Sequence, residues 1–290
     1  MSNPTNLYEG RVAAEWGVAE SSRLKTMDGL FAPVAAADII PPLVERRIGT
    51  FIAGRQATFA DIGAGTGTTT EELCELIGVD YFAIDVNAQL LSDRATREDR
   101  KILGSNTDLP FPDNHFDITH TRAVTGWSNE PLKAISEQLR VTAFGGVAMF
   151  SEFDWTHSGA LPESQAVTAI MKARAIMMRI LRSGGFEPTY GARLAEDVDA
   201  VAHAQGVSYR RQETRHELEV GEYRPFLLHS IDTILEQVEG SRGSIGVIAT
   251  MLSGCRREIA DTEGIKFRLP ALVTQRVDVI APATIATHKM

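Results

Sequence analysis

The sequence predicts an α/β fold with a mostly parallel twisted sheet, helices on both faces and an additional helical cap. Three observations predict it. Between residues 57 and 152, short apolar runs of β-forming residues alternate with stretches of helical periodicity. A glycine-rich turn directly follows the first of these runs. The flanking sequence is mostly helical, with apolar residues at helical spacing.

Composition limits the classes of function. The chain has 290 residues, of which 43% are hydrophobic, and a formal net charge of −9, so a nonspecific grip on nucleic acid is not expected. Its two cysteines, Cys74 and Cys255, lack metal-ligand spacing, and we expect neither a disulfide framework nor a metal site. The N-terminus lacks a basic start followed by an apolar run, and no uninterrupted apolar window approaches 18 residues. We therefore expect a cytoplasmic protein without membrane contact.

Each element has its own signal. One helix is expected in NEPLKAISEQLRV, where Pro131 suits the first turn, and residues 143–146 would form the turn that ends it. A last β-like run, residues 269–280, is expected as an edge strand of the sheet. The methionine-rich stretch 167–181 could be ordinary core or the wall of a malleable pocket. The four strands expected in the core are Thr58–Ile62, Tyr81–Ile84, Phe116–Thr121 and Val147–Glu152, and the helix lies between the last two.

The domain organisation follows from what is missing. The sequence contains no internal repeat, low-complexity tract or Ser/Gly linker, so we expect a single domain over residues 1–290. Its core would cover residues 55–155, with returns to the sheet at 192–218 and 269–281. The helical cap would come from residues 1–45, 160–190 and 222–262.

The most informative segment is FADIGAGTGTTTEEL, residues 59–73. Gly63, Gly65 and Gly67 follow a strand and precede a helix, which lets a ligand approach the bare backbone. Thr68 stands where a dinucleotide-binding loop needs its third glycine, and no lysine of a phosphate-binding loop is present. The loop therefore fits a ligand without a polyphosphate.

Asp85 ends the next expected strand, 22 residues beyond Gly63. An acidic residue at this position of a parallel sheet accepts the ribose hydroxyls of an adenosine-type ligand. The alternative is that Asp85 only caps the following helix.

Four motifs in order then resemble a known family: DIGAGTG, Asp85, GSNTDLPFPDNHFD (104–117) and RVTAFGGVAMFSEFDW (140–155). Together they are similar to the class I S-adenosylmethionine (SAM)-dependent methyltransferases, and most similar to the subgroup of ubiquinone and menaquinone methyltransferases and small-molecule tailoring enzymes. The resemblance covers residues 55–155. It implies a Rossmann-like fold, SAM as cofactor, and methyl transfer by in-line displacement to a small-molecule acceptor in secondary or cofactor metabolism.

The resemblance also implies roles for single residues. The glycine loop would lie under the methionine part of SAM, Asp61 would reach its amino group, and Asp85 would hold the ribose. The family often has Asp where Ser105 stands, so Asn106 or Asp108 could contact the adenine instead. The family's two histidines after the fourth strand are replaced by Gly126 and Trp127, which implies a different substrate wall. The full set of expected cofactor contacts is Asp61, Gly63, Ala64, Gly65, Thr66, Gly67, Asp85, Val86, Asn106, Thr107, Asp108, Thr121 and Arg122.

Methyl transfer from a sulfonium needs positioning more than a base, since alignment alone supplies roughly 7 to 11 kcal/mol of the barrier. The candidate catalytic residues are His120 and Glu152, both near the carboxyl ends of strands. His120 could instead point into a packed face of the sheet, and Glu152 could cap the chain that follows. Asp154 shares the rim with Glu152, and a leading helix with Tyr8 and Trp16 could form a lid.

Other functions are less consistent with these motifs. The shifted third glycine disfavours a nicotinamide-dependent oxidoreductase, and the net charge disfavours a nucleic-acid methyltransferase. A SAM-binding protein without methyl transfer, such as a regulator or a SAM-assisted cyclase, stays open. The expected partner is a small molecule, with a homodimer as the candidate assembly.

Overall fold

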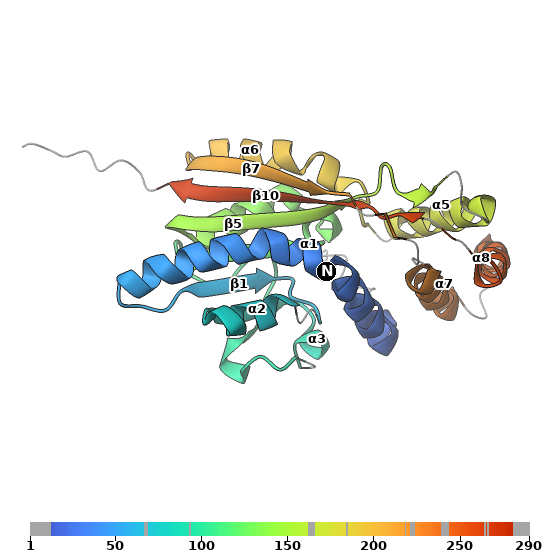
Figure 1. Ribbon diagram of the computed structural model, residues 1–290, viewed down its shortest axis with the longest axis horizontal. Coiled ribbons are helices and arrows are strands. Elements are labelled where there is room, and N and C mark those ends of the chain that lie inside the picture. Colours follow the sequence, from blue (N-terminus) through green and yellow to red (C-terminus); the bar gives the residue numbers. More distant parts are fainter. Residues whose placement is uncertain are drawn as a thin grey trace, which may run out of the picture.

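The sheet dominates the architecture of the computed structural model, which describes residues 13–66, 69–92, 94–161, 166–183, 185–217, 219–220, 224–238, 244–263, 265 and 267–280. Seven strands lie in the order β3-β2-β1-β4-β5-β10-β7, and β10 is the strand that runs antiparallel to its neighbours (Figure 1). The strands are β1 Thr58–Ile62, β2 Asp80–Asp85, β3 Lys101–Leu103, β4 Phe116–Arg122, β5 Thr142–Asp154, β7 Ser208–His216 and β10 Ala271–Ile280. The predicted mostly parallel α/β fold is confirmed.

Eight α-helices of the described chain surround this sheet: α1 Ala13–Ile52, α2 Thr69–Ile77, α3 Ala88–Ser92, α4 Pro131–Val141, α5 Val167–Ser183, α6 Leu194–Ala204, α7 Arg224–Val238 and α8 Ser244–Ala260. Three 3₁₀ turns are η2 Glu98–Arg100, η3 Thr125–Trp127 and η4 Tyr190–Ala192. A small second sheet joins β6 Gly159–Ala160, β9 Phe267–Arg268 and β8 Glu219–Val220.

Helices cover both faces of the sheet. On one face, α1 and α2 bury Leu43 and Cys74 against residues such as Phe59 of β1. On the other, α4 and α6 bury Leu139 and Val198 against β5 and β10. Helix α4 begins at Pro131, as predicted, because the missing N–H of proline costs nothing in the first turn.

Helix α1 has two arms. Pro33, Pro41 and Pro42 lie inside it, and each proline removes an intrahelical hydrogen bond and bends the axis. Figure 1 shows one arm along the sheet and the other leaving it. Ile39 and Leu43, in the arm that lies along the sheet, belong to the core on that face of the sheet. This part of α1 therefore belongs to the core, although the helical cap was predicted to include all of residues 1–45.

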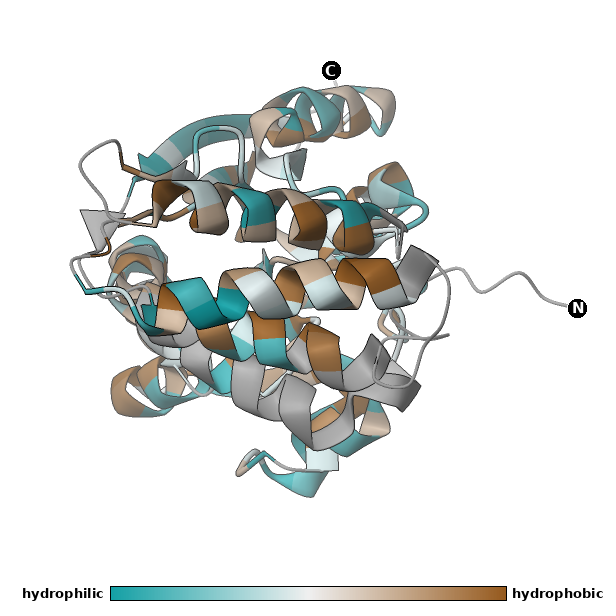
Figure 2. Cartoon of the chain, turned by 90° about the vertical axis from the view of Figure 1, so that its right-hand side faces the viewer, coloured by the Kyte–Doolittle hydropathy of each residue, from teal (hydrophilic) through white to brown (hydrophobic). Residues whose placement is uncertain are grey.

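Helices α5, α7 and α8 gather beyond one end of the sheet (Figure 1). Phe153, near the end of β5, packs among their apolar residues, so this helical layer lies over the carboxyl end of β5. Figure 2 looks onto the layer and shows helices that carry both hydrophilic and hydrophobic residues. Met177 of the methionine-rich stretch is buried in this core, and Met171 is exposed. Hence the ordinary-core interpretation holds for Met177.

Two local expectations were wrong. The run 269–280 is not an edge strand, because β10 lies between β5 and β7 and pairs with both. The edge strand on this side is β7, which lies within the sheet return predicted for residues 192–218. Its charged sequence SYRRQETRH suits an exposed edge. Residues 143–146 are not a turn before the strand. They form an irregularity inside β5, where the register against β4 shifts and Gly145 has a φ of +76°.

Candidate functional site

A pocket opens at the carboxyl ends of β1, β2 and β4, where open α/β sheets bind ligands. It has two adjoining parts of about 910 and about 500 Å³, and we call both together the strand-end pocket. The parts share Leu24, Met27, Gly63, Gly65, Arg122, Ala123 and Phe153. The larger part adds Asp85, Val86, Leu90, Gly104, Asn106, Val124, Trp127, Trp155, Leu181 and Phe186, and the smaller adds Asp28, Phe31, Asp61, Ala64 and Thr66.

The glycine loop forms the floor of this pocket. Gly63 and Gly65 adopt φ values of +72° and +52°, which other residues adopt only with strain. A Cβ atom on Gly63 would lie 2.3 Å from Cγ2 of Val124. The backbone N–H groups of Gly63 and Ala64 both donate to the carbonyl of Ile84, at 2.7 and 3.0 Å. The loop is therefore folded back onto the end of β2; Gly67 lies outside the described residues.

Asp85 closes one side of the loop. Its Oδ2 accepts the N–H of Gly65 at 2.8 Å, and its Oδ1 accepts the N–H of Asn87 at 2.8 Å. Burial raises the pKa of this carboxyl, and the two backbone donors oppose that shift. Asn87 caps helix α3, since its Oδ1 accepts the N–H of Gln89 at 3.0 Å. The interpretation of Asp85 as a helix cap is therefore wrong, and its carboxylate faces the pocket.

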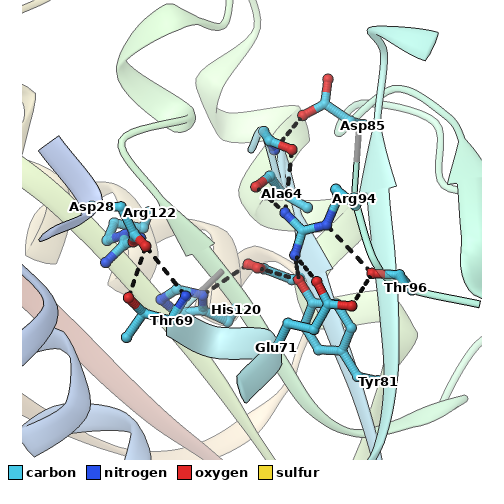
Figure 3. A network of polar contacts seen from close by, with 12 residues as sticks. Asp28, Ala64, Thr69, Glu71, Tyr81, Asp85, Arg94, Thr96, His120 and Arg122 are labelled. Atoms are coloured by element: carbon cyan, nitrogen blue, oxygen red, sulfur yellow. Dashed lines mark hydrogen bonds and ion pairs between the residues drawn. The ribbon is translucent and has the colours of Figure 1, made fainter. Parts of the chain in front are cut away.

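Arg94 holds the loop from behind. Its Nη1 donates to the carbonyls of Ala64 and Gly65, at 2.8 and 3.2 Å. Its Nη2 donates to the hydroxyl of Tyr81 at 2.6 Å and to Glu71 at 3.1 Å, as Figure 3 shows. The side chain is almost fully buried, so these bonds are made in a low dielectric and fix the loop firmly.

Asp28 links α1 to the pocket lining. Its carboxylate accepts the hydroxyl and the N–H of Thr69, at 2.7 and 3.2 Å, and an Nη2 hydrogen bond from Arg122 (Figure 3). Burial alone would raise the pKa of Asp28, but Arg122 and Thr69 bring it below its usual value. One carboxylate thus joins α1, the start of α2 and the end of β4 around the pocket.

Several buried polar atoms of the described pocket lining have no hydrogen-bond partner among the described residues. Buried atoms of the pocket lining that lack a hydrogen-bond partner among the described residues are Thr66 Oγ1, Asn106 Nδ2 and Oδ1, Arg122 Nη1 and Trp155 Nε1. Leaving such groups unpaired costs about 1 to 3 kcal/mol each, and more for a charge. Their convergence on one cavity indicates a polar ligand that pairs with them.

The upper wall is apolar. Trp127 lies on Phe186 with ring centroids 4.6 Å apart, and Leu181, Phe153 and Trp155 extend this surface. Trp127 is one of the two residues that stand in place of the family's histidines and for which a different substrate wall was predicted. A flat, apolar molecule would find contact here.

Comparisons with known proteins agree with this geometry. Residues 60–150 match a family model described as a methyltransferase domain. This stretch of the chain is similar to a methyltransferase domain. A demethylmenaquinone methyltransferase of Renibacterium salmoninarum is 40% identical over 95 residues, which are 32% of this chain and 40% of that protein. A demethylmenaquinone methyltransferase of Mycobacterium tuberculosis is 32% identical over 141 residues, 48% of this chain and 58% of that protein. The matches thus span about half the length of these relatives.

The fold has a counterpart among solved structures. A protein of Anabaena variabilis, assigned as a methyltransferase from an antibiotic biosynthesis pathway, superposes with a TM-score of 0.52 at 14% identity. The superposition covers 79% of this chain and 96% of that one. At this identity the likeness concerns the fold alone.

Of the 13 expected cofactor contacts, nine line the pocket: Asp61, Gly63, Ala64, Gly65, Thr66, Asp85, Val86, Asn106 and Arg122. Thr107, Asp108 and Thr121 do not line it. The hydroxyl of Thr121 donates to Gln138 and supports helix α4, while the Thr107 hydroxyl is paired with that of Ser105. Asp108 is exposed. These three residues do not line the strand-end pocket, and their contact with the cofactor stays a prediction.

The two candidate catalytic residues are also placed away from the lining. His120 is buried, and its Nδ1 lies 3.0 Å from Oδ1 of Asp61, whose Oδ2 accepts the Tyr81 hydroxyl. Strand alternation turns this imidazole into the packed face, the alternative noted from sequence. Burial would raise the pKa of Asp61, but His120 and Arg94 bring it below its usual value.

Glu152 positions a loop. Its Oε1 accepts the N–H groups of Val124 and Thr125, at 3.0 and 2.6 Å, and its side chain is buried. This bond pair holds the turn after β4, whose residues Val124 and Trp127 line the pocket. Glu152 therefore shapes the pocket through this turn.

The other candidates have different outcomes. Asp154 pairs with Arg215, Tyr8 lies outside the described residues, and the side chain of Trp16 is not described.

Burial raises the pKa of Glu152 to about 7, which gives a testable pH dependence of stability. The folded protein holds this proton more tightly than the unfolded chain, so stability from this group is greatest at low pH and falls as pH rises from about 4.5 to about 7. We expect Glu152→Gln, which keeps an acceptor but cannot ionise, to gain about 3 kcal/mol over the wild type between pH 5 and pH 8.

Denaturant unfolding at several pH values measures this difference. Glu152→Ala serves as control, because it removes the acceptor and should be less stable at every pH. An identical gap between wild type and Glu152→Gln at pH 5 and pH 8 would contradict the prediction.

Arg94, Asp28, Leu24 and Met27 were not predicted as site residues, because none of them belongs to a motif. Leu181 lies in the methionine-rich stretch 167–181, for which a pocket wall was one of the two predictions, and it lines the pocket. The described residues contain no cluster of His, Cys, Asp or Glu suited to a metal ion. No helix in the described ranges is long and apolar enough to cross a membrane.

Proposed function

We propose that this protein is a SAM-dependent methyltransferase that transfers a methyl group to a small-molecule acceptor by in-line displacement. The observation that carries the proposal is the set of unpaired buried atoms of Thr66, Asn106 and Arg122 around the carboxylate of Asp85, at the ends of parallel strands. The matched family and the curated relatives support the same reaction class.

The residues present fit the parts of SAM. Asp85 would accept the ribose hydroxyls, and the unpaired amide of Asn106 can both donate to and accept from an adenine edge. The free Nη1 of Arg122 suits the carboxylate of the methionine part. Asp61 lines the smaller part of the pocket and suits its ammonium group.

When bound, SAM supplies a methyl group that is already activated by the positive charge on sulfur. The protein's task is then to align the acceptor and to exclude water, which the wall of Trp127, Phe153 and Phe186 does. The carboxylates of the described lining, Asp28, Asp61 and Asp85, are all engaged in hydrogen bonds that build the site. We therefore assign no general base and ascribe catalysis to positioning.

The acceptor class follows from the wall. Its aromatic and aliphatic side chains suit a flat apolar molecule, and the two relatives named above are demethylmenaquinone methyltransferases. Secondary or cofactor metabolism is thus the proposed setting. A cytoplasmic location, a homodimer and the absence of nucleic-acid binding stay predictions of the sequence.

Calorimetric titration with SAM, S-adenosylhomocysteine and NAD tests the cofactor assignment. We expect both adenosyl ligands to bind and NAD not to bind. Asp85→Ala should weaken binding of both about 100-fold, since it removes charge-assisted bonds worth about 1.5 to 3 kcal/mol each. Glu75→Ala removes an exposed carboxylate of α2 that does not line the pocket; it is the control and should change affinity less than about twofold.

Binding of NAD alone, or unchanged affinity in Asp85→Ala, would overturn the assignment. Turnover of SAM with candidate acceptors then separates an enzyme from a SAM-binding regulator or SAM-assisted cyclase. Binding without any S-adenosylhomocysteine production would favour that alternative.

A further inference from the structure

A groove adjoins the strand-end pocket at Trp155. It measures about 900 Å³ and is lined by Trp155, Thr156, Pro188 and three arginines of helix α5. These arginines, Arg174, Arg179 and Arg182, are five and three residues apart in the sequence, and all face the same groove. We call this the arginine groove.

The positive charge of the groove is poorly balanced. Arg174 donates to the Ser158 hydroxyl at 3.1 Å and to the backbone carbonyl of Trp155, which are both neutral acceptors. Arg179 is exposed and forms no ion pair with any described residue. Arg182 reaches Glu187 at 3.7 Å, and that carboxylate already accepts both the N–H and the hydroxyl of Thr189.

Helix geometry does not account for this cluster. A basic residue in the last helical turn is stabilised by the helix dipole, and this explains Arg182 alone. Arg174 and Arg179 lie further from the end of α5. Burial, followed by the charge of Arg182, lowers the pKa of Arg174, so these like charges repel one another across the groove. In a chain with a net charge of −9, three converging arginines favour an anionic ligand.

The position of the groove suggests which ligand this is. Trp155 lines both the arginine groove and the strand-end pocket, so the two adjoin at this residue. Leu181, one residue before Arg182, lines the pocket from the same helix. A molecule with an apolar part in the pocket can therefore place its other end among the arginines.

We propose that the arginine groove binds an anionic group, a carboxylate or a phosphate, at one end of the methyl acceptor. This inference rests on the proposed function and narrows its substrate class to apolar molecules with an acidic end. The groove selects the acceptor and does not touch the transferred methyl group.

Calorimetry with three six-carbon probes tests the proposal: hexyl phosphate, hexanoate and hexanol, each with and without saturating S-adenosylhomocysteine. We expect at least one anion to bind about tenfold or more tightly than hexanol, with affinity falling as salt rises. The stronger of the two anions identifies phosphate or carboxylate as the preferred group.

Variants locate the binding. Arg179→Gln combined with Arg182→Gln should weaken anion binding about 30-fold, because it removes two charged donors. Lys172→Gln is the matched control: Lys172 is exposed on the same helix but does not line the groove, and its loss should cost less than about twofold. Affinity for S-adenosylhomocysteine should be unchanged in both variants.

Two results would overturn the groove assignment: anions that bind no more tightly than hexanol, or anion binding that survives the double substitution. Failure of S-adenosylhomocysteine to bind would instead overturn the proposed function. The titrations without that ligand keep the two failures distinguishable.

Discussion

Gly63→Ala is expected to reduce affinity for S-adenosylhomocysteine more than about 100-fold, because two separate costs meet at this position. A φ of +72° costs a residue with a Cβ atom about 1 to 2 kcal/mol. In addition, the new Cβ atom would lie 2.3 Å from Cγ2 and 2.8 Å from Cγ1 of Val124. Either the glycine loop or the turn after β4 must then move, and both line the pocket.

The chain offers a matched control for this prediction. Gly54 has nearly the same φ, +73°, but nothing lies within 4 Å of its ideal Cβ position. Gly54→Ala should therefore show only the backbone cost, about 1 to 2 kcal/mol in the free energy of unfolding, with unchanged ligand affinity. Calorimetric affinity and denaturant unfolding are measured for both variants.

A further variant guards against loss of folding. Val124→Ala in the Gly63→Ala background removes both γ carbons that would clash, and should restore part of the stability and affinity that Gly63→Ala alone loses. Affinity within about twofold of wild type in Gly63→Ala would show that the loop does not form the floor of the ligand site.

The features that could be predicted from sequence are those with local causes. Gly63 and Gly65 stand where the chain needs positive φ, and Asp85 ends a strand beside them, so sequence distance and strand direction place all three at one edge. Pro131 and the apolar spacing after it define α4 in the same way. Local chemistry therefore predicted most of the parallel core and the floor of the site.

What the sequence concealed depends on long-range contacts. Arg94 reaches back 30 residues to Ala64, and Arg122 pairs with Asp28 across 94 residues, so neither link leaves a local pattern. His120 was a candidate because it lies near a strand end, but only the packed sheet shows which face it points to. Strand β7 lies within the sheet return predicted for residues 192–218, but its charged sequence gives no apolar alternation from which its bounds could be predicted.

Arg122 is expected to give the second large effect. Its Nη2 is engaged by Asp28, while its buried Nη1 has no partner among the described residues and lines the pocket. Arg122→Lys keeps a positive charge that can pair with Asp28 but removes the second planar donor. We expect affinity for S-adenosylhomocysteine to fall about 10- to 100-fold, the loss that corresponds to one hydrogen bond to a charged group.

Asp28→Asn separates ligand binding from the tie between α1 and β4. It removes the carboxylate charge, weakens the link to Arg122 and Thr69, and leaves the free Nη1 in place. We expect its main effect on the free energy of unfolding, about 1 to 3 kcal/mol, with a smaller change in affinity than in Arg122→Lys. The reverse order, with Asp28→Asn losing affinity and Arg122→Lys retaining it, would show that Arg122 only anchors α1.

Binding of adenosine tests which part of the ligand Arg122 contacts, because adenosine has no carboxylate. Its affinity should be equal in wild type and Arg122→Lys if Nη1 binds the carboxylate of the methionine part.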